Sequence, residues 1–442
     1  MRSTPRTQPT PDAQSAHDAQ STGNTPDTPP TPGPAPRNRD VLISGASIAG
    51  PALALMLRRY GFNPTVVERA PELRPGGYKV DLRGVAIEVC ERMGILPEVR
   101  RDSTGMVGGS YVDADGRTIA ELPAEIFGGR AEGDDEIMRG DLARILYERT
   151  RDDVEYLFGD SIAALDEDAD GVTVAFERGG VRRFDLVVGA DGLHSHTRRL
   201  AFGDEKQFTR HLGAYISIFT APNDLGLDRW ETYYALPDKL VCAYSASGQT
   251  TAKNMLVFGS PELSYDYRDA AQQKKLLADV FEGDGWIIPR MLHNAQAADD
   301  FYFDALTLIE MDRWSKGRVV LLGDAAHCAS PASGQGTGLA LIGAYILAGE
   351  LAAARGDHTV AYRRYESEMR PGVELNQKFA ENFAKEMTVS SERKIRLRMR
   401  MVRWLPKLPW KNLVAKKIRD DLQKAAHAIP VKAYALPVEQ YA

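Results

Sequence analysis

Short runs of mainly apolar residues punctuate the chain, and each ends at or just before a glycine or an acidic residue. They occupy residues 41–44, 65–67, 185–189 and 317–323. Runs of about four to eight β-branched and leucine residues between turn signals are typical of buried strands in a parallel sheet. Apolar stretches with helical character follow at residues 51–60 and from residue 339 onward. The pattern predicts an α/β fold in which Gly-rich turns join strand ends to helix starts.

The first of these turns reads Gly45-Ala46-Ser47-Ile48-Ala49-Gly50. It matches the dinucleotide fingerprint G-x-G-x-x-G except that Ser47 replaces the middle glycine, and serine is small enough to let a pyrophosphate approach. The next strand ends in Glu68-Arg69, at the distance where an acid holds a ribose. The expected nucleotide contacts are Gly45, Ser47, Ile48, Ala49, Gly50, Glu68 and Arg69. The alternative is a βαβ turn that binds no nucleotide.

The stretch that begins at residue 317 leads from a buried strand through a Gly/Ser/Pro loop into an apolar helix. Its glycines leave backbone N–H groups accessible at the helix start, where the helix dipole adds roughly half a positive charge. An electron-rich group should bind there, and Asp324 could accept hydrogen bonds from sugar or sugar-alcohol hydroxyls. The candidate residues are Gly323, Asp324, Pro331, Gly334, Gln335, Gly336, Thr337 and Gly338. The alternative is an ordinary strand-turn-helix in which Asp324 caps the helix.

A further strand, at residues 185–189, ends in Asp191-Gly192, and Ser195 and Arg198 follow on what reads as a helix start. Small residues at the turn permit close approach of a phosphate, and Arg198 could pair with one. A plain hairpin-ended strand explains this segment equally well when it is considered alone.

Alternating aromatic and small residues between residues 214 and 258 predict antiparallel strands. The strands are expected at residues 214–220, 231–236, 240–244 and 254–258, and a hairpin at 108–122 should join the same layer. Tyr215, Tyr233 and Met255 are candidates for the wall of a substrate pocket, since such rings can stack on a planar ligand. The alternative is that these aromatic residues are plain core.

Taken together, the Gly45–Gly50 turn with Glu68, the Asp191-Gly192 segment and the Gly323–Gly338 segment resemble the signature motifs of class A flavoprotein monooxygenases, which have the para-hydroxybenzoate hydroxylase fold. In that family an Arg followed by a Leu, at the place of residues 136–146 here, begins a helix and lies against the flavin diphosphate, which assigns that role to Arg139. Residues 76–84 resemble enzymes that hydroxylate polyketide antibiotics, including the tetracycline-inactivating monooxygenases.

The resemblance implies a Rossmann-like FAD-binding domain of three-layer ββα type, an inserted antiparallel β-sheet domain for the substrate, and C-terminal helices. The FAD-binding domain is expected at residues 40–103, 132–203 and 303–370. The substrate domain is expected at residues 104–131 and 204–302, and the C-terminal helical segment at residues 371–442. Residues 1–39, rich in Thr and Pro, are expected to be a disordered tail.

The implied activity is hydroxylation of an aromatic or polyketide-like molecule with O2, through a flavin C4a-hydroperoxide. The cofactor carries this chemistry, so no catalytic side chain and no metal are assigned. The helix start at residues 334–338 should stabilise the N1/C2=O edge of reduced flavin, with Pro331 near the reactive edge. His327 is read as structural. No second fingerprint appears, so NADPH, or NADH, is expected to bind transiently as reductant.

Composition and charge bear on the cellular compartment and the partners of the protein. A net charge of -6 argues against nucleic-acid binding, and three dispersed cysteines favour a reducing compartment, hence the cytoplasm. No signal peptide is visible, and the apolar run at residues 339–354 is short for a membrane span. Residues 393–419 carry eleven Lys/Arg and no Asp/Glu. We read them as a solvated helix pair, interrupted by prolines, and keep membrane-surface contact as the alternative. Either a monomer or a homodimer fits.

Three other functions share this pattern: a flavin-dependent reductase or dehydrogenase, a halogenase, and a flavoprotein that sequesters a ligand without turnover. Trp286-Ile287-Ile288-Pro289 matches half of a flavin-dependent halogenase motif, but Asp284 stands where its first Trp belongs. Trp286 is therefore read as packing. Product formation without O2 would indicate the reductase, and tight binding without oxygenated product would indicate the sequestering protein.

Overall fold

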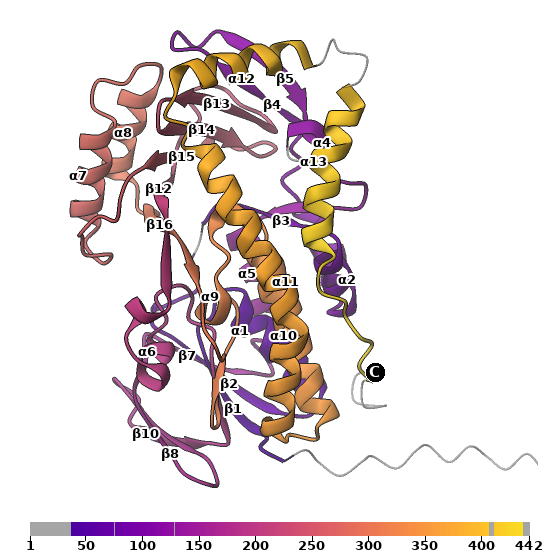
Figure 1. Cartoon of the computed structure of the whole chain (residues 1–442). Coiled ribbons are helices and arrows are strands. Elements are labelled where there is room, and N and C mark those ends of the chain that lie inside the picture. Colours follow the sequence, from indigo (N-terminus) through magenta and orange to yellow (C-terminus); the bar gives the residue numbers. More distant parts are fainter. Residues whose placement is uncertain (1–36, 75, 128, 406–410, 436–442) are drawn as a thin grey trace, which may run out of the picture.

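The computed structural model describes residues 37–405, apart from 75 and 128, and residues 411–435. The expectation of a disordered tail therefore falls almost entirely outside the described residues. The first described residues lie against the loop that follows α10, where the Arg37 N–H donates to the Arg355 carbonyl at 3.0 Å. Figure 1 shows two layered regions, one above the other, joined by long C-terminal helices.

The lower region is built on a six-stranded sheet whose order is β17-β18-β11-β1-β2-β7. Its strands are β1 (Asp40–Ser44), β2 (Asn63–Glu68), β7 (Glu155–Phe158), β11 (Leu186–Gly189), β17 (Ser315–Lys316) and β18 (Val319–Leu321). All neighbours pair in parallel except β17 with β18. Four strands are the predicted apolar runs, and β1, β11 and β18 are buried along nearly their whole length because both faces of the sheet are covered.

Helices cover one face of this sheet and a small second sheet covers the other, as predicted for a ββα arrangement. The helical layer holds α1 (Ala49–Arg59), α5 (Arg139–Glu148) and α10 (Gly336–Ala353). The opposite layer is an antiparallel sheet of β8 (Ile162–Glu167), β9 (Val172–Phe176) and β10 (Val181–Phe184). One apolar cluster joins Leu42 and Val187 of the large sheet to Val172 and Val174 of the small one.

Helix α10 is apolar on all sides. Within the described residues it alone is long and apolar enough to cross a membrane, but 78% of its length is buried inside the protein. It packs against α1, α2 (Val85–Arg92) and α11 (His358–Met387). A helix that is hydrophobic all round is a core helix when other elements enclose it, and α10 meets that condition.

The upper region is a seven-stranded sheet with the order β16-β12-β15-β14-β13-β4-β5. Its strands are β4 (Gly108–Val112), β5 (Thr118–Pro123), β12 (Thr209–Pro222), β13 (Trp230–Leu236), β14 (Lys239–Ser245), β15 (Thr251–Gly259) and β16 (Tyr302–Ile309). All pair antiparallel except β13 with β4. The four predicted strands and the predicted hairpin are all present.

One expected domain boundary is wrong. We expected the FAD-binding domain to resume at residue 303, but β16 pairs with β12 from Tyr302 to Ile309. Residues 302–309 therefore belong to the seven-stranded sheet, where they form the partner strand of the long β12. The outer face of this sheet is covered by α7 (Ala270–Val280) and α8 (Ile288–Ala297), and its inner face looks toward the six-stranded region.

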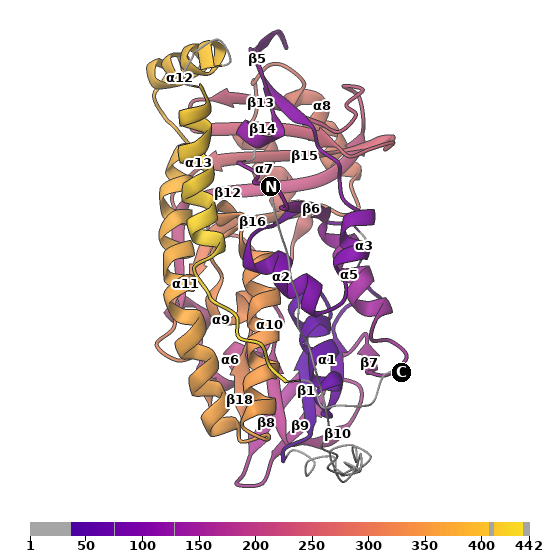
Figure 2. The same ribbon diagram turned by 90° about the vertical axis from the view of Figure 1, so that its right-hand side faces the viewer.

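The C-terminal helices connect the two regions (Figures 1 and 2). Helix α11 runs from the six-stranded region up to the seven-stranded sheet, α12 (Glu392–Trp404) lies across β5 and β13, and α13 (Lys411–Ala426) lies along α11 and α4 (Ala124–Phe127). Ile395 and Met399 are the buried residues of α12. In the described part of the basic stretch, α12 is therefore largely solvated, with two side chains packed on the protein and with Leu397, Met401 and Trp404 exposed. The prolines at 406 and 409 lie outside the described residues.

The remaining elements are short and mostly frame the space between the two sheets. They are β3 (Lys79–Leu82), α3 (Leu96–Arg101), β6 (Asp135–Met138), α6 (His196–Phe202), α9 (Asp324–His327) and the 3-10 turns η1 (Glu205–Gln207) and η2 (Pro331–Ser333). Strands β3 and β6 pair with each other and form a ribbon below the seven-stranded sheet.

Candidate functional site

A cavity of about 1690 Å³ lies between the six-stranded and seven-stranded sheets. Residues from all three glycine turns line it, although these turns are separated by more than a hundred residues in the sequence. The predicted residues that line it are Gly45, Ser47, Ile48, Ala49, Glu68, Arg69, Arg139, Asp191, Gly192, Asp324, Pro331, Gly334, Gln335, Gly336 and Thr337. The remaining three predicted glycines, at 50, 323 and 338, pack beside the cavity wall without lining it.

The Gly45–Gly50 turn is tight because the strand end and the helix start are in contact. A β-carbon on Gly50 would lie 1.9 Å from the Gly45 carbonyl oxygen, and one on Gly45 would lie 2.4 Å from the Ala190 carbonyl oxygen. Gly45 also has φ +109, which L side chains rarely adopt. Helix α1 begins at Ala49, and no side chain caps its N-terminus. The first N–H groups of the helix are therefore left for a ligand in the cavity.

Glu68 ends β2 at the rim of this turn. Its carboxylate accepts the Ala46 N–H at 2.9 Å through one oxygen and the Ala70 N–H at 2.9 Å through the other. These bonds fix the carboxylate at the carboxyl end of the strand, where dinucleotide folds hold a ribose, and leave lone pairs for hydroxyl donors.

Arg139 begins α5 on the opposite side of the turn. Its Nη2 donates to the Ser47 hydroxyl at 2.6 Å, and its backbone N–H donates to the Tyr78 carbonyl at 2.9 Å. Ser47, in the place of the fingerprint's middle glycine, thus anchors a guanidinium next to the helix start. Cationic and N–H donors converge here, as an anionic diphosphate requires.

Asp324 faces the cavity from the start of α9, and its side chain is exposed to that space. The protein that surrounds the cavity partly desolvates the carboxyl and raises the pKa of Asp324, and the charge of Arg139 opposes the rise. The adjacent Gly323 has φ +63, and a β-carbon there would meet Ala49 at 3.3 Å. Gly323 therefore brings β18 against α1 and does not contact the ligand space.

The start of α10 presents unpaired donors to the cavity. Its N-cap residue, Gln335, makes no side-chain capping bond, and Gly334 before it has φ +63. The Gln335 Nε2 is buried without a hydrogen-bond partner among the described residues. A buried orphan donor at a helix N-terminus fits an electron-rich ligand edge. Gly338 instead allows α10 to pack closely on α2, since a β-carbon there would lie 3.3 Å from Ala86 of α2.

The Asp191-Gly192 segment is built differently from the sequence expectation. The Asp191 carboxylate accepts hydrogen bonds from the Thr197 N–H at 2.9 Å and from the Ser195 and Thr197 hydroxyls. Arg198 is fully buried and donates to the carbonyls of Ala325 at 2.9 Å and Leu193 at 2.6 Å. It also forms an ion pair with the Glu205 carboxylate at 2.8 Å. The idea that Arg198 pairs with a phosphate is wrong, because its guanidinium points into the core and is held by these partners.

His327 is structural, as read from the sequence. It is buried, its Nε2 lies 3.3 Å from the Tyr365 hydroxyl, and its ring packs on Trp314 with centroids 4.6 Å apart. Burial lowers the pKa of His327 to about 4, so the ring is neutral at physiological pH. Trp286 also packs, against Tyr234, and does not line the cavity.

The proposed pocket wall divides between the two faces of the seven-stranded sheet. Tyr233 and Met255 line the cavity. Tyr215 does not, because alternation along β12 places it opposite Ile216 and Ile218, which do line it. The Tyr215 ring instead stacks on Phe258 in the outer core, and its hydroxyl accepts the Leu263 N–H at 2.7 Å. As a pocket residue, Tyr215 is therefore a wrong choice.

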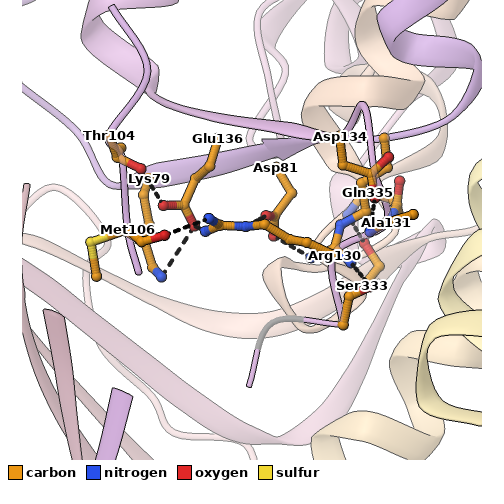
Figure 3. Close-up of polar contacts among 12 residues, drawn as sticks. Lys79, Asp81, Thr104, Met106, Arg130, Ala131, Asp134, Glu136, Ser333 and Gln335 are labelled. Atoms are coloured by element: carbon orange, nitrogen blue, oxygen red, sulfur yellow. Dashed lines mark hydrogen bonds and ion pairs between the residues drawn. The ribbon is translucent and has the colours of Figure 1, made fainter. Parts of the chain in front are cut away.

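A buried charge network in the cavity wall was not foreseen. Glu136 of β6 binds both Lys79, at 3.1 Å, and Arg130, and Figure 3 shows it between these two cations. Burial alone would raise the pKa of Glu136, but the charges of Lys79 and Arg130 outweigh it and lower the pKa. The only sequence signal was the polar-apolar-polar alternation of Lys79-Val80-Asp81 within residues 76–84.

His194, next to the Asp-Gly turn, also lines the cavity and was not foreseen. Its Nδ1 lies 2.8 Å from Glu205 and its Nε2 lies 3.1 Å from Asp304. Burial would lower the pKa of His194, but hydrogen bonds to the Asp304 and Glu205 carboxylates raise it to about 10. The ring is therefore an imidazolium that joins α6 and η1 to strand β16.

The fold and these residues together define a protein that binds a flavin dinucleotide: a fingerprint turn, a ribose-side carboxylate, an anchored arginine and a donor-rich helix start fit FAD. The FAD binding domain family matches residues 38–380. A flavin-dependent monooxygenase of Legionella longbeachae is 42% identical over 360 residues, which cover 80% of this chain and 92% of that protein. The chain therefore belongs to the class A FAD-dependent monooxygenases, and FAD is its cofactor.

Other relatives agree with this assignment. An uncharacterized protein of Mycobacterium tuberculosis is 48% identical over 341 residues, covering 77% of this chain and 92% of that protein. The crystal structure of tetracycline destructase Tet(55) superposes with a TM-score of 0.78 at 40% identity, covering 90% of this chain and all of that one. The enzyme thus takes O2 and a small-molecule substrate, with NAD(P)H as the reductant general to the family.

Proposed function

We propose that this enzyme hydroxylates a planar aromatic or polyketide-like molecule, held between FAD and the inner face of the seven-stranded sheet. The observation that carries the proposal is the size of the cavity. At about 1690 Å³ it exceeds the roughly 300–1,000 Å³ of a pocket for one ligand, and so has room for a cofactor and a sizeable substrate.

The lining of the upper part of the cavity supports a flat, largely apolar substrate. Ile216, Ile218 and Met255 come from the seven-stranded sheet, and Phe379 and Phe383 come from α11 on another side. Aliphatic and aromatic side chains on opposing walls suit a fused-ring system, which buries its faces without losing hydrogen bonds. The structural neighbours Tet(55) and Tet(51) are tetracycline destructases, which favours a polyketide over a simple phenol.

We assign the lower part of the cavity to FAD. Glu68 would accept hydrogen bonds from the ribose, Arg139 and the α1 start would hold the diphosphate, and the α10 start with Gln335 would meet the pyrimidine edge. Bound FAD supplies the electron-transfer and oxygen-transfer chemistry. The chain supplies position, donors for developing negative charge, and a cover of sheet and helices that keeps water out.

Helix α12 contributes to that cover. Its buried residues Ile395 and Met399 line the cavity and pack over β5 and β13. We infer that the basic C-terminal stretch serves the substrate site. The buried, free cysteines Cys90, Cys242 and Cys328 suit a cytoplasmic enzyme.

The test is incubation of the purified yellow protein with NADPH, ¹⁸O2 and a panel of phenols, anthraquinones and tetracyclines. We expect at least one fused-ring compound to stimulate NADPH oxidation and to gain one ¹⁸O atom by mass spectrometry. Stimulated oxidation that yields only hydrogen peroxide with every fused-ring compound, or labelling confined to single-ring phenols, would refute the proposed substrate class.

A further inference from the structure

We propose that Lys79 and Tyr244 form a pair of hydrogen-bond donors that recognises two neighbouring oxygen atoms on one edge of the substrate. The inference rests on the proposed function, since it names the part of the substrate that the cavity recognises through hydrogen bonds. Lys79 comes from β3 and Tyr244 from β14, and both side chains line the cavity.

The position of the Lys79 ammonium is set by two carboxylates. Its Nζ lies 2.7 Å from Glu231 of β13 and 3.1 Å from Glu136 of β6, and both glutamates are almost fully buried. An ammonium has three N–H donors in a fixed arrangement. Two of them are directed to these carboxylates, and the third has no acceptor among the described residues. Lys79 thus holds one donor toward the cavity with little freedom to move.

Tyr244 offers the second donor. Its hydroxyl oxygen accepts the backbone N–H of Lys79 at 3.1 Å, and no described residue accepts its own O–H. The side chain is 4% exposed, so bulk water does not readily satisfy this group. The Lys79 ammonium lies 5.1 Å from the centre of the same ring. The two uncommitted donors are therefore neighbours on one wall.

The network around the pair is balanced in charge. Lys79, Arg83 and Arg130 face Asp81, Glu136 and Glu231 through a continuous series of ion pairs. Part of this series is visible in Figure 3. Arg83, Glu136 and Glu231 are buried, and the other three groups are half-buried. The network therefore carries a desolvation cost, and apolar residues could join β3 to the sheet without it. This cost is explained if the network holds hydrogen-bond donors in place for a ligand. Because the network has no net charge, it favours neutral carbonyl or phenolic oxygens over a carboxylate or a phosphate.

The apolar surroundings fix which edge of the substrate faces the pair. Tyr111, Phe127 and Tyr233 form a ring cluster, with centroids 5.1 to 5.9 Å apart, on the same side of the cavity. A fused-ring ligand that packs its face against such rings can present only an edge to Lys79 and Tyr244. The recognised group is therefore an oxygen-bearing edge, such as adjacent carbonyl and hydroxyl oxygens on a ring system.

The experiment compares two ligands on the FAD-loaded enzyme: 1,8-dihydroxyanthraquinone, with three adjacent oxygens on one edge, and anthracene, with the same rings and none. Equilibrium dialysis gives the dissociation constants for the wild type, Lys79→Met and Tyr244→Phe. A double variant, Lys79→Met with Glu231→Gln, removes a charge from each side and covers the case in which the single Lys79 variant fails to fold. The matched control is Tyr234→Phe, which alters the residue next to Tyr233 on the opposite face of β13, outside the cavity.

We expect Lys79→Met and the double variant to weaken binding of the anthraquinone roughly 10- to 100-fold, and Tyr244→Phe roughly 3- to 10-fold. Anthracene binding should stay within about twofold in every folded variant that retains FAD. Equal losses for both ligands would overturn the inference in favour of a purely structural network. No preference of the wild type for the anthraquinone would overturn it as well. The ¹⁸O experiment tests the proposed function separately, because it measures oxygen transfer to the substrate and not the preference for the anthraquinone over anthracene.

Discussion

The imidazolium of His194 gives a pH-dependent contribution to stability that can be worked out from the structure. The pKa of His194 is raised to about 10 from an ordinary value of 6.5, because Asp304 and Glu205 accept its two N–H bonds. A raised pKa stabilises the folded state fully below pH 6.5, and the contribution is lost as the pH rises toward 10. The variant His194→Gln should lack this pH dependence.

The magnitude follows from the two pKa values. A pKa of about 10 against 6.5 corresponds to at most roughly 5 kcal/mol of unfolding free energy. Since the side chain is 28% exposed, solvent screening reduces this to about 2 kcal/mol. For 442 residues the entropy of unfolding is roughly 0.9 kcal/mol/K, so the expected effect on Tm is about 2 °C.

The assay is differential scanning fluorimetry of the FAD-loaded wild type and His194→Gln at pH values from 6 to 10. The wild type should melt about 2 °C above the variant at pH 6, and the gap should fall steadily and nearly close by pH 10. The control His293→Gln, on the exposed surface of α8, should show no such trend. A gap that stays constant would mean that stacking of His194 on Tyr267 matters and its charge does not.

Three further predictions concern the part of the protein that we assign to FAD. Glu68→Gln should raise the FAD dissociation constant about tenfold, measured by ultrafiltration, because it removes a charged ribose acceptor; an unchanged constant would place the ribose elsewhere. Gly50→Val should give colourless or insoluble protein, since its β-carbon would lie 1.9 Å from the Gly45 carbonyl, whereas Gly285→Ala, with 3.7 Å of clearance, should stay yellow. Arg198→Met should lower Tm by about 3–5 °C through loss of a buried pair, with FAD affinity retained; a larger effect on FAD than on Tm would restore a phosphate role.

The glycine turns could be predicted from the sequence because their requirements are local. The Gly45–Gly50 turn needs small residues within six positions, and a strand before and a helix after it can be read from the hydrophobic pattern. The same holds for the Gly/Ser/Pro loop before α10. These turns also predict that the strand ends meet, because the carboxyl ends of parallel strands lie at one edge of the sheet.

The substrate wall could not be predicted in the same way. Both faces of the seven-stranded sheet are apolar, so alternation along β12 separates Tyr215 from Ile216 without saying which face borders the cavity. Lys79 and Glu231 are 152 positions apart and meet only because β3 lies under β13. For Arg198, the motif indicated a cation at a helix start, but whether it points outward or into the core depends on Ala325, far along the chain.

The central claim is that one cavity, closed by both sheets, holds FAD along its lower wall with the substrate above it. A crystal structure of the yellow enzyme tests this most directly. We predict FAD density that runs from the Glu68 carboxylate, past Arg139, to the start of α10 at Gly334–Gly336, with open space between the flavin ring and Tyr233. Density for FAD outside this path, or a flavin ring that fills the space below Tyr233 and leaves no room for a second molecule, would contradict the account.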